Sequence, residues 1–81
     1  MGRVVVEVMP KPEILDPQGK AIDAALAEKG YDRFRSVRQG KRFELEVDGE
    51  VTEGDLELIH RVAEEVLANF VIEDVVKVEA L

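Results

Sequence analysis

The chain contains no cysteine, and it has one histidine, one serine, one threonine and one tyrosine. Without cysteine it can form neither disulfides nor thiolate zinc sites. His60 follows Ile59 at the edge of an apolar stripe, where a lone histidine is usually a packing residue. Ser36 has none of the flanking glycines that expose a nucleophile. The sequence therefore predicts no catalytic, cofactor-binding or metal-binding residue.

Long hydrophobic runs are also absent. The N-terminal stretch MGRVVVEVMP has only a few consecutive apolar residues, with Glu7 among them. We therefore expect neither a signal peptide nor a membrane span, and we expect a cytoplasmic protein with no membrane partner. The length of 81 residues and the hydrophobic content of 46% predict one domain over residues 1–81.

Negative charge is in excess, with a formal net charge of −7. This excess argues against nucleic-acid binding. The charges are divided along the chain: residues 1–42 are net basic, while residues 43–81 are strongly acidic. The stretch RFRSVRQGKR at 33–42 holds five basic residues and no acid. Such a split can serve a ligand, a partner subunit or solubility.

The first half of the chain predicts a strand and a helix. RVVVEVM at 3–9 is valine-rich and is followed by PKP, which is typical of a strand that ends there. Asp16 fits an N-cap and Pro17 the first helical position. Gly30 is expected to end the helix in a left-handed conformation. One helical face would carry the apolar residues Ala21, Ile22, Ala25 and Leu26.

Residues 34–48 predict a second strand, in which apolar and acidic residues alternate from Phe43 onward. Gly40 interrupts the alternation. It is either a bulge in one long bent strand or, with Gln39, a tight hairpin turn. The bent strand is the favoured interpretation.

The second half predicts another helix and a final strand. Thr52 as N-cap, with Asp55 three residues later, resembles a capping box. Residues with helical spacing follow, namely Leu56, Ile59, Ala63, Val66, Leu67 and Phe70, with Asn69 as a C-cap. The last strand spans 71–81, with Val76, Val78 and Ala80 on one face.

This order predicts an α+β fold, the two-layer ferredoxin-like plan β-α-β(β)-α-β, with two helices on one face of an antiparallel sheet. The other face of the first strand would carry Val5, Glu7 and Met9, which is amphipathic. A second sheet or a second subunit is therefore expected to cover part of it, and we predict a homodimer or a higher assembly.

The stretch DPQGK at 16–20 admits three interpretations. A helix start with Gly19 and Lys20 can bind an anion, but a single glycine is far from a phosphate-binding loop. A plain capped helix explains Asp16 and Pro17. It does not explain Gly19, which lowers helix propensity unless something packs closely against it. A contact surface for a partner is the third possibility.

Three separated blocks resemble the PurS family, the small subunits of phosphoribosylformylglycinamidine synthase in purine biosynthesis. They are LDPQGKAI, GYDRFRSVRQGKRFELEV and VLANFVIED, in the family's order and at its length. Phe70 departs from the family, which usually has proline at that position. The resemblance implies a PurS-like dimer that bridges a glutaminase subunit (PurQ) and a synthetase subunit (PurL) and assists ammonia transfer between them.

The implied enzyme is an ATP-dependent carbon–nitrogen ligase with glutamine as amido donor. It converts formylglycinamide ribonucleotide to formylglycinamidine ribonucleotide, with ATP and Mg used by the large subunit and no cofactor in this chain. The resemblance also suggests that the two glycine-bearing segments contact partners, through Asp16, Pro17, Gln18, Gly19, Lys20, Arg38, Gly40 and Lys41. An alternative for the basic stretch is that it faces the phosphorylated substrate. An alternative for the whole chain is a ferredoxin-like regulatory domain that binds a small anionic ligand.

Overall fold

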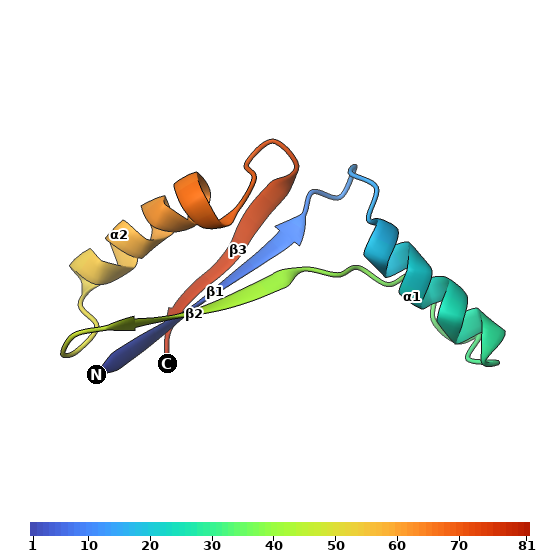
Figure 1. The fold of residues 1–81 in the computed structure, drawn as a ribbon, viewed down its shortest axis with the longest axis horizontal. Helices are drawn as coiled ribbons and strands as arrows, with labels where there is room; N and C mark the ends of the chain where they lie inside the picture. The colour runs from blue at the N-terminus through green and yellow to red at the C-terminus, as the bar shows by residue number, and fades with distance from the viewer.

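The computed structural model describes residues 1–81 (Figure 1). In chain order its elements are β1 (Gly2–Pro10), α1 (Pro17–Glu28), β2 (Lys41–Val47), α2 (Glu53–Val62), the π-helical turn η1 (Ala63–Leu67) and β3 (Glu73–Ala80). The α+β, ferredoxin-like fold class is confirmed. No helix is both long enough and apolar enough to cross a membrane.

The sheet has three antiparallel strands in the order β2-β1-β3, so the valine-rich β1 lies at its centre. Val4 pairs with Leu45 of β2 on one side and with Ala80 of β3 on the other. A central strand must be apolar on at least its covered face, which explains why β1 carries the densest run of β-branched residues.

The core lies between β1 and the second helical segment. Val4, Val6 and Val8 are fully buried, and Ile59, Ala63 and Ala68 pack against them from α2, η1 and the residue that follows. Burying one such valine stabilises the fold by about 1.5–3 kcal/mol relative to leaving it in water. With nine buried residues in all, the core of the protomer is small.

Helix α1 begins and ends where the sequence predicts. Asp16 is its N-cap and Pro17 its first residue. At the other end Gly30 has φ +88°, and the Tyr31 N–H donates to the Leu26 carbonyl, as in a Schellman cap.

The position of α1 is where the expectation of two helices on one sheet face is wrong for the single protomer. Figure 1 shows α1 beyond the end of the sheet, with only α2 and η1 over the sheet face. The molecule is accordingly long and thin, 48 × 26 × 14 Å. The apolar stripe of α1 stays partly open, and Ile22 is 40% exposed.

Gly40 forms no hairpin turn. Strand β2 begins directly after it, and the preceding segment 31–40 runs outward from the sheet to α1 without ladder pairing (Figure 1). The favoured strand over 34–48 with a bulge at Gly40 is also wrong, because only residues 41–47 form a strand, in a regular register with β1. The segment that follows α1 leads directly into β2, and α1 stays beyond the end of the sheet (Figure 1).

The second helix follows its start signal and then departs from the expected spacing. Thr52 and Asp55 form the capping box. The α-helix then widens into η1, where the Ala68 N–H donates to the Ala63 carbonyl five residues back. This wide turn rotates the following residues, so Ala68 is buried. Val66 and Phe70, expected in the core, are 73% and 74% exposed.

Strand β3 also departs from the expected alternation. Lys77 pairs with Glu7 and Val75 with Val8, which leaves Val76 without a partner in a register shift. Val75 therefore packs against the core while Val76 is exposed, contrary to the expected set of Val76, Val78 and Ala80. The cause is the extra residue in β3, which moves the side chains on one side of it to the other face of the sheet.

The sheet face opposite α2 is largely charged. Glu7 lies 3.9 Å from Arg42 Nε, and Arg42 also pairs with Glu44 along β2. Lys77 Nζ lies 3.4 Å from Glu79 of the same strand. Cross-strand neighbours of opposite charge stabilise a solvated sheet face modestly. A subunit covering this face stays a prediction.

Candidate functional site

Three chain segments meet at the end of the sheet where β1 leads into α1. A pocket of about 340 Å³ is lined by residues from 10–18, from 39–41 and by Ile72 and Glu73. All of the lining residues except Pro10 and Ile14 belong to the three sequence blocks quoted above. Segments far apart in the sequence thus build one surface, which is the candidate functional site.

Asp16 lies at the centre of this site. It is 7% exposed and is the one charged residue that is buried. Its Oδ2 accepts the Gln39 N–H at 2.7 Å, and its Oδ1 accepts the Gly19 N–H at 3.0 Å. These two donors, first Gln39 and then Gly19, lower the pKa of the Asp16 carboxyl. One side chain therefore caps α1 and joins it to the chain returning toward β2.

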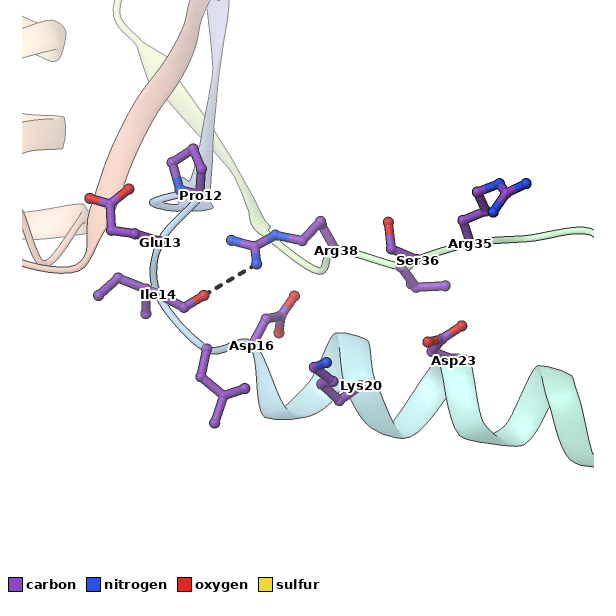
Figure 2. A pocket seen from close by; sticks show the side chains of 11 residues that line it. Pro12, Glu13, Ile14, Asp16, Lys20, Asp23, Arg35, Ser36 and Arg38 are labelled. Carbon is purple, nitrogen blue, oxygen red and sulfur yellow. Dashed lines mark hydrogen bonds between the residues drawn. The ribbon is translucent and has the colours of Figure 1, made fainter.

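Arg38 ties the same place together from the other side. Its guanidinium donates to the carbonyls of Lys11 at 2.8 Å, Pro10 at 3.2 Å and Ile14 at 3.2 Å. Figure 2 shows the bond to Ile14. The planar guanidinium spreads its N–H donors over a fixed fork that reaches all three carbonyls, whereas the lysine ammonium is a compact point charge. We call Asp16, Arg38 and these five hydrogen bonds the clasp.

The two glycines of the site lie against the chain's own backbone. A Cβ on Gly19 would come closer than 3.0 Å to the Val37 carbonyl and to the Asp16 carboxylate, and a Cβ on Gly40 would meet Val8 and Met9 as closely. The helix-weakening Gly19 is thereby explained by close packing within the chain. Contact between these glycines and a partner stays a prediction.

Other predicted contact residues remain accessible. Pro17, Gln18, Lys20 and Lys41 are all exposed. Gln18 accepts a hydrogen bond from Gln39. Lys41 Nζ lies 3.0 Å from Glu73 Oε2, and the pKa of Glu73 is lowered first by the Asn69 N–H and then by Lys41.

Sequence reasoning missed the apolar part of this surface. Leu15 is 69% exposed and Ile72 is 39% exposed, and both line the pocket of about 340 Å³. A signal for Leu15 was present. It directly precedes the N-cap, where an apolar residue usually packs against the fourth helical residue, and that residue is Lys20. With no apolar partner on the helix, Leu15 is left exposed.

A second pocket of about 380 Å³ lies beside the first, between the start of α1 and residues 35–38 (Figure 2). Lys20, Arg35 and Ser36 line it, which would suit an anion. Glu13, Asp16 and Asp23 line it as well, so its charge does not favour one sign.

The basic stretch 33–42 is used largely within the chain. Arg38 belongs to the clasp, Lys41 pairs with Glu73, and Arg42 lies beside Glu7 and Glu44. Arg33 and Arg35 are exposed and make no ion pair. A role of the stretch toward a partner or the substrate therefore falls chiefly to these last two.

No group of three or more histidine, aspartate or glutamate residues is arranged to hold a metal ion. His60, expected to pack at the edge of the apolar stripe, is exposed, with its Nδ1 3.9 Å from Glu64. Ser36 lines the pocket of about 380 Å³, which His60 does not reach. The structure thus brings together a partly apolar surface around the clasp, and it places Ser36 and His60 apart.

Comparison with known proteins agrees over the whole chain. The family described as PurS, phosphoribosylformylglycinamidine (FGAM) synthase, matches residues 3–80. The PurS subunit of Mycobacterium leprae is 55% identical over 74 residues, which cover 91% of this chain and 90% of that protein. The PurS subunit of Bacillus subtilis is 43% identical over 75 residues, with 91% and 87% covered.

Solved structures show the same fold. Bacillus subtilis PurS superposes with a TM-score of 0.83 at 39% identity, covering 100% of this chain and 99% of that chain. A chain of PurLQS from Thermotoga maritima superposes with a TM-score of 0.84 at 30% identity, covering 99% and 96%.

Proposed function

This chain belongs to the PurS family, the subunits of phosphoribosylformylglycinamidine synthase in purine biosynthesis, and we propose that it acts there as a non-catalytic assembly subunit. The enzyme is an ATP-dependent amidotransferase ligase. This chain has no cysteine that could serve as a glutaminase nucleophile and no glycine-rich phosphate-binding loop for ATP. We place both chemistries, with ATP and Mg, in the large subunits, and we place the assembly in the cytoplasm.

The observation that carries this proposal is the full-length match to PurS within PurLQS of Thermotoga maritima. We carry the assembly over to this chain, which then contacts a PurL synthetase subunit and a PurQ glutaminase subunit and assists ammonia transfer between them. The complex would convert formylglycinamide ribonucleotide, glutamine and ATP to formylglycinamidine ribonucleotide, glutamate, ADP and phosphate.

We place the contact with a large subunit at the surface around the clasp. Interfaces draw most of their energy from apolar anchors that become fully buried, while charges at the rim add little. Leu15 and Ile72 are the anchors available. Around them lie Pro17, Gln18 and Lys41 of the same pocket, and Lys20 of the neighbouring one. Leu15→Ala should therefore weaken binding of the large subunits. Leu58→Ala is the matched control, because Leu58 is an exposed leucine on α2, outside this pocket.

The homodimer is supported by the position of α1. In the ferredoxin-like plan two helices share one sheet face, yet in this protomer only α2 and η1 occupy it. Phe43, Leu45 and Val47 of β2 are left half-buried on that face. The apolar stripe of α1, with Ile22 and Leu26, is also incompletely covered. An apolar stripe and a vacant apolar face on the same chain are complementary between two copies.

We therefore propose that each copy places α1 over the sheet of the other, which is an exchange of identical elements. Leu26→Glu should dissociate the dimer, because it puts a charge into the apolar contact. Ala27→Glu is the matched control on the adjacent exposed position of the same helix. Sedimentation measures both. Equal dimer dissociation constants for the two variants would contradict the exchange.

Reconstitution tests the function itself. Glutamine-dependent formation of formylglycinamidine ribonucleotide should require this chain in addition to the two large subunits, and the isolated chain should show neither glutaminase nor ATPase activity. Full activity of the large subunits without this chain would refute the assembly role. A regulatory anion-binding module would instead gain thermal stability on addition of phosphate and form no complex.

A further inference from the structure

The direction of α1 has to be determined at its base, because α1 does not pack on its own sheet. We call residues 17–37 the arm; they comprise α1 and most of the segment that returns to β2. Figure 1 shows the arm leaving the sheet through two chain crossings, residues 11–16 on the way out and residues 38–40 on the way back. The clasp joins these two crossings to each other.

The hydrogen bonds of the clasp are placed to fix the angle between the arm and the sheet. Asp16 lies on the outgoing crossing. Its Oδ1 accepts the N–H of Gly19 in the first turn of the arm, and its Oδ2 accepts the N–H of Gln39 on the returning crossing. The Arg38 guanidinium, on the returning crossing, spans three carbonyls of the outgoing one. Asp16 and Arg38 each form hydrogen bonds between the outgoing and the returning chain. Together they restrict rotation of the arm about its base more than either residue alone.

We propose that Asp16 and Arg38 are positioning residues that fix the direction of the arm, so that α1 arrives in register on a second copy. This inference rests on the dimer proposed above. An arm without the clasp samples several directions, of which one fits the second copy. Both arms of the dimer must point that way at once, so the apparent affinity is multiplied by the square of the fraction of time that one arm spends in that direction. A fraction of about one third therefore gives about a tenfold loss.

The distance between the arm and the sheet can be measured directly. The chain has no native cysteine, so cysteines introduced in Ala27→Cys and Asp48→Cys can carry two spin labels without interference. Both positions are exposed, one on α1 and the other directly after β2. Pulsed electron–electron double resonance gives the distribution of distances. Every labelled chain also carries Leu26→Glu, which is expected to keep it monomeric, so that each distance lies within one protomer and no second copy holds the arm.

Two variants test the role of the clasp, one at each of its two residues. Arg38→Met removes three hydrogen bonds and keeps an unbranched side chain. Asp16→Asn keeps the shape, but its NH2 group takes the place of one carboxylate oxygen and faces an N–H donor that it cannot accept. Arg38→Lys keeps the charge without the fork and should give an intermediate result. Arg35→Met is the matched control, an exposed arginine of the same segment with no ion pair.

We expect both clasp variants to broaden the distance distribution and to raise the dimer dissociation constant about tenfold. Circular dichroism of the sheet should stay unchanged, and Arg35→Met should leave the distance distribution as in the wild type. Distributions as narrow as the wild type in both clasp variants would overturn the proposal. Broadening with an unchanged dissociation constant would overturn the link to assembly. A monomeric wild type would refute the dimer instead, while the widths would still decide the role of the clasp.

Discussion

Gly19 can be tested by adding a single methyl group. In most helices Gly→Ala stabilises, by about 1 kcal/mol, because alanine has the higher helix propensity. Here the new Cβ would lie closer than 3.0 Å to the Val37 carbonyl and to the Asp16 carboxylate. Neither can move aside freely, because the first is backbone and the second holds two N–H groups. We therefore expect Gly19→Ala to destabilise the protein.

The magnitude follows from three opposing effects. Overpacking at a close contact costs about 1–3 kcal/mol. Displacing the N-cap carboxylate costs about 1 kcal/mol more. The gain in helix propensity offsets about 1 kcal/mol of this. A net loss of about 1–3 kcal/mol in the free energy of unfolding is expected, which for a domain of this size lowers Tm by roughly 4–8 °C per kcal/mol.

Gly54→Ala is the matched control. Gly54 also lies in the first turn of a helix, but its Cβ would meet only Thr52 Oγ1, at an ordinary 3.7 Å. We expect this variant to be as stable as the wild type or up to about 1 kcal/mol more stable. Urea unfolding of all three proteins at equal concentration compares them, because the stability of a dimer depends on protein concentration.

Of the two variants, only Gly19→Ala should thus destabilise the protein. A Gly19→Ala protein at least as stable as the wild type, with the distance distribution of the arm unchanged, would refute the reasoning. It would mean that residues 16–19 and Val37 separate without loss, and the clasp could not then fix the arm.

Three further predictions follow from local structure. Thr52→Ala should cost about 1 kcal/mol in urea unfolding, because the Asp55 N–H loses its cap; Thr52→Ser should restore it, and equal loss in both would count against the cap. The pKa of Asp16 is lowered by the Gln39 N–H, so the stability it adds is present above the pKa of the unfolded chain and lost as pH falls through the folded one. In the Asp16→Asn protein the free energy of unfolding should therefore fall less than in the wild type between pH 7 and about pH 3. The same pH dependence in both proteins would contradict this. Ile59→Ala should cost about 2–5 kcal/mol, and a loss below about 1 kcal/mol would place Ile59 outside the core.

Local signals in the sequence were sufficient for the element starts and ends. Asp16 with Pro17 starts α1, Thr52 with Asp55 starts α2, and Gly30 ends α1 with φ +88°. Each signal depends on atoms within five residues of one another, so no tertiary contact is needed for it to act. The family could also be identified, because three long blocks agree in order and spacing.

Periodicity could not predict which side chains in the second half of the chain face the core. One wide turn at 63–67 puts Ala68 in the core and Phe70 in water, and one extra residue in β3 exposes Val76. Both departures are single-residue shifts. Spacing rules assume a constant period, so they carry no information on where a shift of one residue lets the core close.

The sequence alone was enough to predict a valine-rich central strand, two capped helices, an acidic second half and no catalytic residues. Only the tertiary structure decided the purpose of Gly19 and the direction of α1. The atom that excludes a side chain at Gly19 belongs to Val37, and the groups that hold the arm come from residues 10–16 and 38–39. An apolar helix stripe can be buried equally well on its own sheet or on that of a second copy. The choice between these two sheets depends on whether the chain turns back at Gln39–Gly40. The close packing of Gly40 on Met9, together with the clasp, keeps the chain extended there.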